Sequence, residues 1–212
     1  MADPKQKYYD KRAQLLLKNL QSRHFEAYYC ENKEEALKKA LELIPEGVSI
    51  GWGGAMSAQQ IGLLDALNEG PYQAIDRDKA ANPQEREEAM RKCLMADWFV
   101  TGANALSLTG EMVNIDGNGN RVAAIVYGPR HVLVIAGMNK VVATLENAVT
   151  RARTIAAPMN KQRFPIQTPC EVTGACADCK SEGCICNQIL ITRNSKPAGR
   201  IKMILVGEEL GF

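Results

Sequence analysis

The fold class of this 212-residue chain is indicated most clearly by the segment Val48-Ser-Ile-Gly-Trp-Gly-Gly-Ala-Met-Ser57. A short apolar run enters a turn rich in glycine, and residues 57–68 then have the composition of a helix. Such a strand, turn and helix in direct succession is the repeating unit of proteins with a parallel sheet, whose neighbouring strands need a helical crossover.

The same alternation of strand and helix continues along most of the chain. We predict helices over residues 5–22, 33–44, 83–95 and 144–156, and strands near 25–30, 71–75, 97–101, 112–115 and 131–136. Residues 121–127 fit either a strand or a short helix. We therefore expect an α/β fold with a mostly parallel sheet and helices on both faces.

The composition changes in the C-terminal part of the chain. Three prolines between positions 158 and 169 bracket an irregular segment. Two apolar stretches, 189–193 and 200–206, are predicted to form an antiparallel β-hairpin with the cysteine-rich loop at its base. We expect an α/β domain over 1–165, with 166–212 packed on the same domain. The exposed edge of this hairpin is compatible with a homodimer.

Composition and charge exclude several classes of protein. Apolar residues make up 46% of the chain and charged residues 24%, as in ordinary soluble globular proteins. A formal net charge of +2 gives no support to nucleic-acid binding. No apolar run approaches the roughly 18–20 residues of a membrane span, and residues 1–7 lack the apolar stretch of a signal peptide. We expect a cytoplasmic protein.

Five cysteines lie close together in the C-terminal part: Cys170, Cys176, Cys179, Cys184 and Cys186. In a reducing cytoplasm such a cluster indicates metal or redox chemistry more than a disulfide framework. Cys176 and Cys179 form a C-x2-C pair, whose sulfurs are able to reach one metal ion or one face of a cluster. The spacing is compatible with four states of these cysteines: a zinc site, an iron–sulfur cluster, unliganded thiols, or a reversible disulfide between Cys176 and Cys179.

The glycine turn is a candidate ligand site. Gly51, Gly53 and Gly54 let the backbone approach a ligand, and the free amides of the helix that starts near Ser57 favour an anion such as phosphate or carboxylate. The alternative is a tight turn that needs glycine only for its geometry. The spacing matches neither the dinucleotide fingerprint nor the P-loop, so no nicotinamide or flavin site is predicted.

Polar loops follow other predicted strands, and ligands of parallel sheets lie at the carboxyl ends of the strands. Glu111 is a candidate general base or nucleophile, the alternative being a solvated loop glutamate. Lys140 follows a buried strand and is a candidate anion ligand, the alternative being a surface lysine. Asn104, Asn118 and Gly119 complete the predicted ligand-binding set.

Five segments of this chain, taken in order, resemble one known family. They are SIGWGGAMSAQQIGL at 49–63, ADWFVTGANA at 96–105, LTGEMVNIDGNGNR at 108–121, GPRHV at 128–132 and AAPMNKQR at 156–163. Together they resemble the LUD-domain family, also called DUF162, which is associated with bacterial lactate utilisation. The resemblance covers most of residues 1–165.

The resemblance implies a fold similar to ribose-5-phosphate isomerase, glucosamine-6-phosphate deaminase and the CoA transferases. In that superfamily the glycine turn holds a phosphate or CoA-like group and a glutamate of the middle loops performs chemistry; the roles would fall on Gly53, Gly54, Ser57 and Glu111. It also implies a component of lactate or organic-acid oxidation that acts with iron–sulfur subunits. The alternative is a non-catalytic ligand-binding or redox- and metal-sensing regulatory protein of the same fold.

The cysteine element resembles the tail of a branch of short family members. The pattern implied by that branch, C-x5-C-x2-C-x6-C, selects Cys170, Cys176, Cys179 and Cys186 as metal ligands and leaves Cys184 as an extra thiol. Four thiolates suit structural zinc, and the order of the ligands also resembles that of an iron–sulfur cluster. The choice between these two cofactors stays open.

Overall fold

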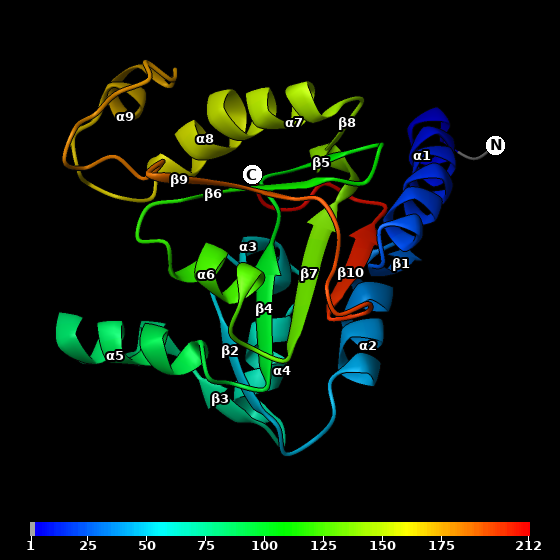
Figure 1. Ribbon diagram of the computed structural model, residues 1–212, viewed down its shortest axis with the longest axis horizontal. Coiled ribbons are helices and arrows are strands. Elements are labelled where there is room, and N and C mark those ends of the chain that lie inside the picture. Colours follow the sequence, from blue (N-terminus) through cyan, green and yellow to red (C-terminus); the bar gives the residue numbers. More distant parts are fainter. Residues whose placement is uncertain (1–2) are drawn as a thin grey trace.

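Six parallel strands form the central sheet of the computed structural model, which describes residues 3–212 (Figure 1). In the order in which they lie side by side, they are β1 (Glu26–Cys30), β10 (Ile201–Val206), β7 (His131–Gly137), β4 (Trp98–Gly102), β2 (Ser49–Trp52) and β3 (Gln73–Ile75). The run 132–136 of β7 is fully buried, as expected for a strand covered on both faces. The mostly parallel sheet predicted from the sequence is confirmed.

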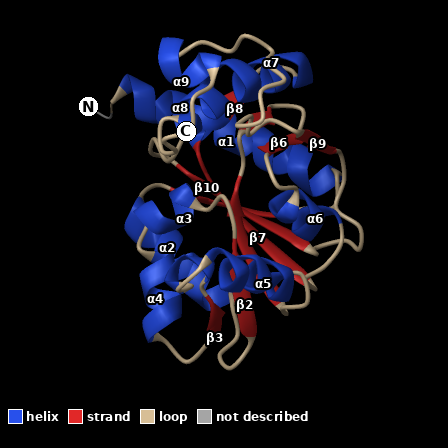
Figure 2. Ribbon diagram, turned by 90° about the vertical axis from the view of Figure 1, so that its left-hand side faces the viewer, coloured by secondary structure: helices blue, strands red, loops and turns tan. Residues whose placement is uncertain are grey.

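Helices cover both faces of this sheet (Figure 2). On one face lie α2 (Lys33–Leu43), α3 (Met56–Gln60) and α4 (Leu63–Glu69), and on the other α1 (Pro4–Ser22), α5 (Pro83–Cys93) and α6 (Asn120–Val126). Strand β4 shows how the two cores are separated: Trp98 and Val100 point into the first, whereas Phe99 points into the second. The α/β fold with helices on both faces is therefore confirmed.

Several helices begin and end where the sequence predicts. The side chain of Asn32 accepts a hydrogen bond from the amide of Glu35 at 2.9 Å and caps α2. The helix predicted over 57–68 is instead divided into α3 and α4, because Gly62 between them has φ of +79°. The ambiguous segment 121–127 is mostly helical and forms α6.

A second, smaller sheet lies across the carboxyl ends of the central strands (Figure 1). It contains β8 (Val141–Val142), β5 (Ala105–Ser107), β6 (Met112–Asp116) and β9 (Gln188–Thr192), in that order. A rod of α7 (Leu145–Arg151), a π-helical turn η3 (Ala152–Ala156) and α8 (Ala157–Lys161) packs on it. The 3-10 turns η1 (Arg77–Lys79) and η2 (Met138–Lys140) and the helix α9 (Pro169–Thr173) complete the fold.

The antiparallel hairpin predicted for the C-terminal part does not form. Strand β9 pairs with β6 in the second sheet, while β10 is inserted between β1 and β7 in the central sheet and runs parallel to both. Residues 203–206 of β10 are fully buried, and such a continuous apolar run suits a central parallel strand better than a hairpin. The hairpin edge on which the expected homodimer depended is therefore absent, and β9 is an edge of the second sheet instead.

The helices described over residues 3–212 include none that is long and apolar enough to cross a membrane.

We expect Gly51→Ala to destabilise the protein by about 1–3 kcal/mol, because overpacking a filled core has a cost of this size. A Cβ atom on Gly51 would lie 2.3 Å from the sulfur of Cys93 and 2.9 Å from its Cβ. Chemical denaturation of the variant measures the loss. Cys93→Ala in the same chain should recover part of it, since the nearest clashing atom is then absent; purely additive effects would contradict this account.

Candidate functional site

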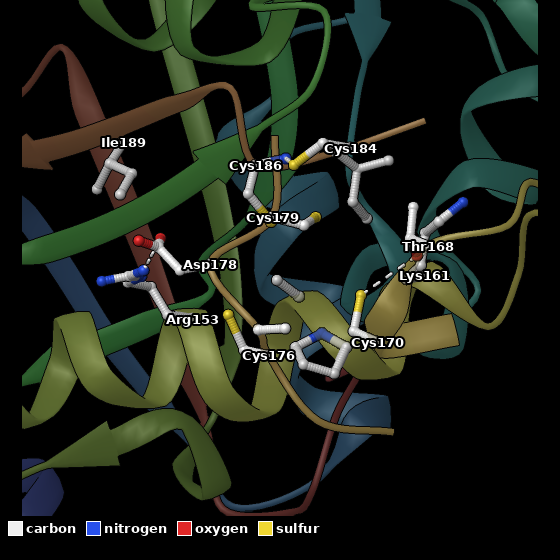
Figure 3. A pocket seen from close by; sticks show the side chains of 14 residues that line it. Arg153, Lys161, Thr168, Cys170, Cys176, Asp178, Cys179, Cys184, Cys186 and Ile189 are labelled. Carbon is white, nitrogen blue, oxygen red and sulfur yellow. Dashed lines mark hydrogen bonds and ion pairs between the residues drawn. The ribbon is translucent and has the colours of Figure 1, made fainter. Parts of the chain in front are cut away.

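The C-terminal cysteines surround a cavity of about 230 Å³. Figure 3 shows Cys170 and Cys176 on one side of this space and Cys179, Cys184 and Cys186 on the other. Part of the wall comes from α8, through Ala157, Pro158 and Lys161. The fold therefore brings together the four cysteines predicted as ligands and adds the fifth thiol to the same cavity.

Local interactions hold the loop that carries these cysteines. The hydroxyl of Thr168 accepts a hydrogen bond from the amide of Glu171 and caps α9, which ends at Gly174 with φ of +72°. Further along, the guanidinium of Arg153 donates to the carboxylate of Asp178. The first contact fixes the start of α9, and the second attaches the following part of the cysteine loop to the helical rod, since Arg153 lies on η3.

The thiols of the cavity differ in their electrostatic surroundings. Burial and the neighbouring thiols of Cys184, Cys170 and Cys176 raise the pKa of Cys186 to about 12. The hydroxyl of Ser181 donates a hydrogen bond to the sulfur of Cys179 at 3.4 Å and lowers the pKa of that thiol. A bound cation would favour the deprotonated form of all these sulfurs, because a metal ion reverses the effect of crowded negative charges.

The size of the cavity bears on the cofactor that the cysteines would hold. Zinc draws four sulfurs to about 2.3 Å from a single point, whereas an iron–sulfur cluster places metal and sulfide between more widely spaced thiolates. Within residues 3–212, no three His, Cys, Asp or Glu side chains are arranged to hold one metal ion. The cavity volume of about 230 Å³ is several times the ~30 Å³ that one water molecule occupies in the liquid, so the cavity can hold a group of several atoms.

Lys161 adds a buried cation to the wall of this cavity. The side chain is fully buried, and its ammonium has no hydrogen-bond partner among the described residues. A buried charge of this kind requires compensation by negative charge nearby. Four thiolates around a cluster provide that compensation, so Lys161 fits an anionic cofactor in the cavity.

A second candidate site lies at the carboxyl ends of the central strands. We call it the cationic centre and define it by Arg77 on η1, Arg121 on α6, Lys140 on η2 and Arg151 on α7. Arg121, Lys140 and Arg151 are each less than one-tenth exposed. Burial lowers the pKa of Arg121, attraction to Asp116 opposes this in part, and repulsion from Arg77 lowers the pKa further, so these charges act on one another.

The glycine turn lies directly beneath two of these arginines. A Cβ atom on Gly53 would lie 3.7 Å from Nη1 of Arg77, and one on Gly54 would lie 2.4 Å from Nη1 of Arg121. Gly54 also has φ of +59°, which few other residues adopt. Gly54 is thus required for Arg121 to approach the turn, whereas a Cβ on Gly53 would be crowded by the ring of Phe99 at 3.1 Å and not by Arg77. The carbonyls of both glycines are occupied by Thr101 and Gly102.

Three other predicted ligand residues belong to the same centre. The ammonium of Lys140 donates a hydrogen bond to the hydroxyl of Ser57 at 3.0 Å. The side-chain oxygen of Asn104 lies 3.3 Å from Nη2 of Arg121, and its backbone carbonyl accepts from Arg151. Burial, together with repulsion from Arg151 and Arg121, lowers the pKa of Lys140 to about 7. The reading of Lys140 as a surface lysine is therefore wrong.

The remaining predicted residues lie elsewhere. Gly51 packs against Cys93 within β2, Asn118 is exposed in the loop before α6, and Gly119 precedes that helix with φ of +85°. Their roles in ligand binding stay predictions. Reasoning from the sequence missed Arg77, Arg121 and Arg151, because nothing in their spacing indicates that they meet.

Glu111 forms its hydrogen bonds and its ion pair at a distance from the glycine turn. Its carboxylate accepts hydrogen bonds from Ser107 and Thr109 and pairs with Arg23, and none of these belongs to the cationic centre. Burial alone raises the pKa of Glu111, but the two hydroxyls and Arg23 outweigh it and keep the pKa below its ordinary value. An ionised carboxylate held in this way is a weak base. Its catalytic role stays a prediction.

Comparisons with known proteins agree with this architecture. The family model described as LUD domain matches residues 13–206. The fold is also similar to the crystal structure of a DUF162 family protein from Deinococcus radiodurans, with a TM-score of 0.54. The two sequences are 10% identical, and the alignment covers 93% of this chain and 97% of that one, so the likeness concerns the fold. No curated protein matches the chain.

The buried Lys140 makes stability depend on pH. Its amine releases a proton near pH 7 in the folded protein but near 10.4 when unfolded. Between these values the unfolded chain binds more protons, so stability rises with pH, by up to about 1.4 kcal/mol per unit. We expect this slope between about pH 7 and 9 in chemical denaturation, and expect Lys140→Met to remove it. Lys38→Met, at an exposed lysine, should keep it, and equal slopes for both variants would contradict the assignment.

Proposed function

Because the chain belongs to the LUD-domain family, we propose that it is an iron–sulfur component of lactate or related organic-acid oxidation. The observation that supports this most is the cavity itself. Five thiols surround one space, and a fully buried cation in its wall, Lys161, has no partner among the described residues. Structural zinc would need four sulfurs at about 2.3 Å from a single point.

In this proposal Cys170, Cys176, Cys179 and Cys186 hold a cluster of four irons and four sulfides. When bound, such a cluster supplies one-electron transfer. Cys184 also lines the cavity, and its sulfur accepts a hydrogen bond from the amide of Cys186 at 3.4 Å. We assign Cys184 no iron, and it stays beside the cluster as a fifth thiol.

A small anionic ligand would bind at the second site, above the glycine turn. The cationic centre favours negative charge there, and the fold connects this centre with the cysteine cavity. Arg151 on α7 belongs to the centre, whereas Lys161 on α8 lines the cavity, and both lie on one continuous rod of helix. A substrate site and an electron acceptor on the same rod suit an oxidation in which electrons pass on to partner subunits.

Metal and sulfide analysis tests the cofactor. Protein purified without oxygen should contain iron and acid-labile sulfide in equal amounts, about four of each per chain. Cys176→Ser and Cys179→Ser should lose most of both, because each removes a ligand. Cys184→Ser should keep them, as should Cys30→Ala, whose thiol is buried in the main core.

Protein that contains zinc but no sulfide would contradict the proposal, and the cysteine loop would then have a purely structural role. Protein that takes up neither metal after reconstitution would also contradict it. Thiol-based sensing by a regulatory protein of the same fold would then be favoured.

Lys161→Met should lower the midpoint potential of the cluster, on the order of tens of millivolts, because a nearby positive charge stabilises the reduced state. A titration followed by electron paramagnetic resonance measures the shift. Lys180→Met is the matched control: this lysine neighbours Cys179 in sequence but is exposed, so its charge is screened by solvent. A larger shift for Lys180→Met than for Lys161→Met would contradict the assignment.

A further inference from the structure

Cys184 lines the cysteine cavity but holds no iron in the proposed cluster, so its position needs an explanation of its own. Its side chain is a hydrogen-bonding neighbour of the thiols of both Cys179 and Cys186. Figure 3 shows these three cysteines on the same side of the cavity. Two of them are ligands in the proposed cluster. In protein without a cluster, Cys184 is therefore able to react with a thiol that would otherwise bind iron.

A tight turn brings Cys184 back towards Cys179. The amide of Cys184 donates a hydrogen bond to the carbonyl of Ser181 at 3.0 Å, which is the contact that closes a β-turn. The hydroxyl of Ser181 also donates to the sulfur of Cys179 at 3.4 Å, so both cysteines are attached to one residue. Inside the turn, a Cβ atom on Gly183 would lie 2.4 Å from Cγ2 of Ile166, so the turn packs closely against an earlier part of the loop. Local structure thus holds the two sulfurs near one another.

Other partners for Cys179 are less well placed. Cys176 lies on the opposite side of the cavity, and Asp178 between the two has φ of +50° and pairs with Arg153 on the helical rod (Figure 3). Cys186 packs against the hydrophobic core of the second sheet, which shields part of its sulfur from a dissolved oxidant. The thiol across the turn is therefore the favoured partner.

We propose that Cys179 and Cys184 form a reversible disulfide in protein without a cluster, and that this bond prevents the cluster from being inserted. The inference rests on the proposed function, because Cys179 is one of the iron ligands there. Iron–sulfur clusters are held by thiolates, and a sulfur bonded to another sulfur is no longer a thiolate. The oxidised chain lacks one ligand, so cluster insertion depends on the redox state of a thiol that holds no iron itself.

A small two-electron oxidant such as hydrogen peroxide balances the reaction. One of the two sulfurs attacks the peroxide, whose O–O bond breaks, and a sulfenic acid and a water molecule form. The other sulfur attacks the sulfenic sulfur, which forms the S–S bond and releases a second water. The two thiols lose two electrons and two protons, and the peroxide takes up both. A dithiol reductant restores the thiols by exchange. Both cysteines are half-buried, so small reagents are able to reach them.

Peptide mapping of the full chain tests the bond directly. Reduced protein without a cluster is treated with an equimolar amount of hydrogen peroxide, alkylated and digested with trypsin. Cleavage after Lys180 separates Cys179 from Cys184, so the expected disulfide joins two different peptides, residues 164–180 and 181–193. We expect these linked peptides after peroxide and expect a dithiol to remove the link.

Variants identify the two partners. Cys179→Ser and Cys184→Ser should each lose the linked peptides, whereas Cys186→Ser should keep them. Cys30→Ala, at a buried thiol of the main core, is the matched control and should behave as the unchanged chain. Three results would overturn the inference: no disulfide, a disulfide only between Cys176 and Cys179, or one only between Cys184 and Cys186. The last two bonds each lie within a single peptide and are thus recognised.

Reconstitution with iron and sulfide tests the consequence for the cluster. Prior treatment with peroxide should lower iron uptake by the unchanged chain several-fold, and a dithiol should restore it. Cys184→Ser should take up the same amount of iron with and without peroxide, because Cys179 then has no partner across the turn. Cys184→Ala provides a second test in case serine disturbs the fold. A loss of uptake after peroxide in both variants, equal to that of the unchanged chain, would contradict the role of Cys184.

The two measurements separate this inference from the proposed function. Linked peptides in a protein that takes up no iron even when fully reduced would overturn the cluster and leave the disulfide standing. A cluster in a chain that never forms the linked peptides would overturn the disulfide and leave the redox function standing.

Discussion

Strand β10 pairs with both β1 and β7, and this pairing fixes the path that the chain takes after β7. It places residues from the end of the chain in the middle of the central sheet, where residues 203–206 are fully buried. The chain between β7 and β10 must therefore leave the sheet at its carboxyl end and return to the opposite end. On this path it forms η2, the helical rod, the cysteine loop and β9.

This path puts two chemically different sites at one end of the fold. The cationic centre draws its side chains from η1, α6, η2 and α7, and the cysteine cavity lies between α8, α9 and the loop before β9. Each site contains a buried cationic side chain with a nitrogen that has no hydrogen-bond partner among the described residues, Arg121 in one and Lys161 in the other. Buried charge of this kind lowers stability unless a ligand completes it, which is typical of functional sites.

The sequence predicts some residues of the two sites correctly and fails for others, for identifiable reasons. Gly53, Gly54, Ser57 and Lys140 were predicted because a glycine turn and the end of a buried strand are local signals, and the structure brings them together. Glu111 was selected as an isolated carboxylate, but its partner Arg23 comes from the distant end of α1. No local signal reveals such a partner.

The α/β class, the order of most strands and helices, and the cysteine cluster follow from the sequence, since periodicity, turn residues and spacing are properties of neighbouring residues. The division of β9 and β10 between two sheets depends on long-range packing, because two apolar strands in succession fit a hairpin equally well. Only the tertiary structure places Arg77 and Arg121 over one glycine turn. Those contacts join residues far apart in the chain, and the burial that makes their charges significant exists only once the sheet has formed.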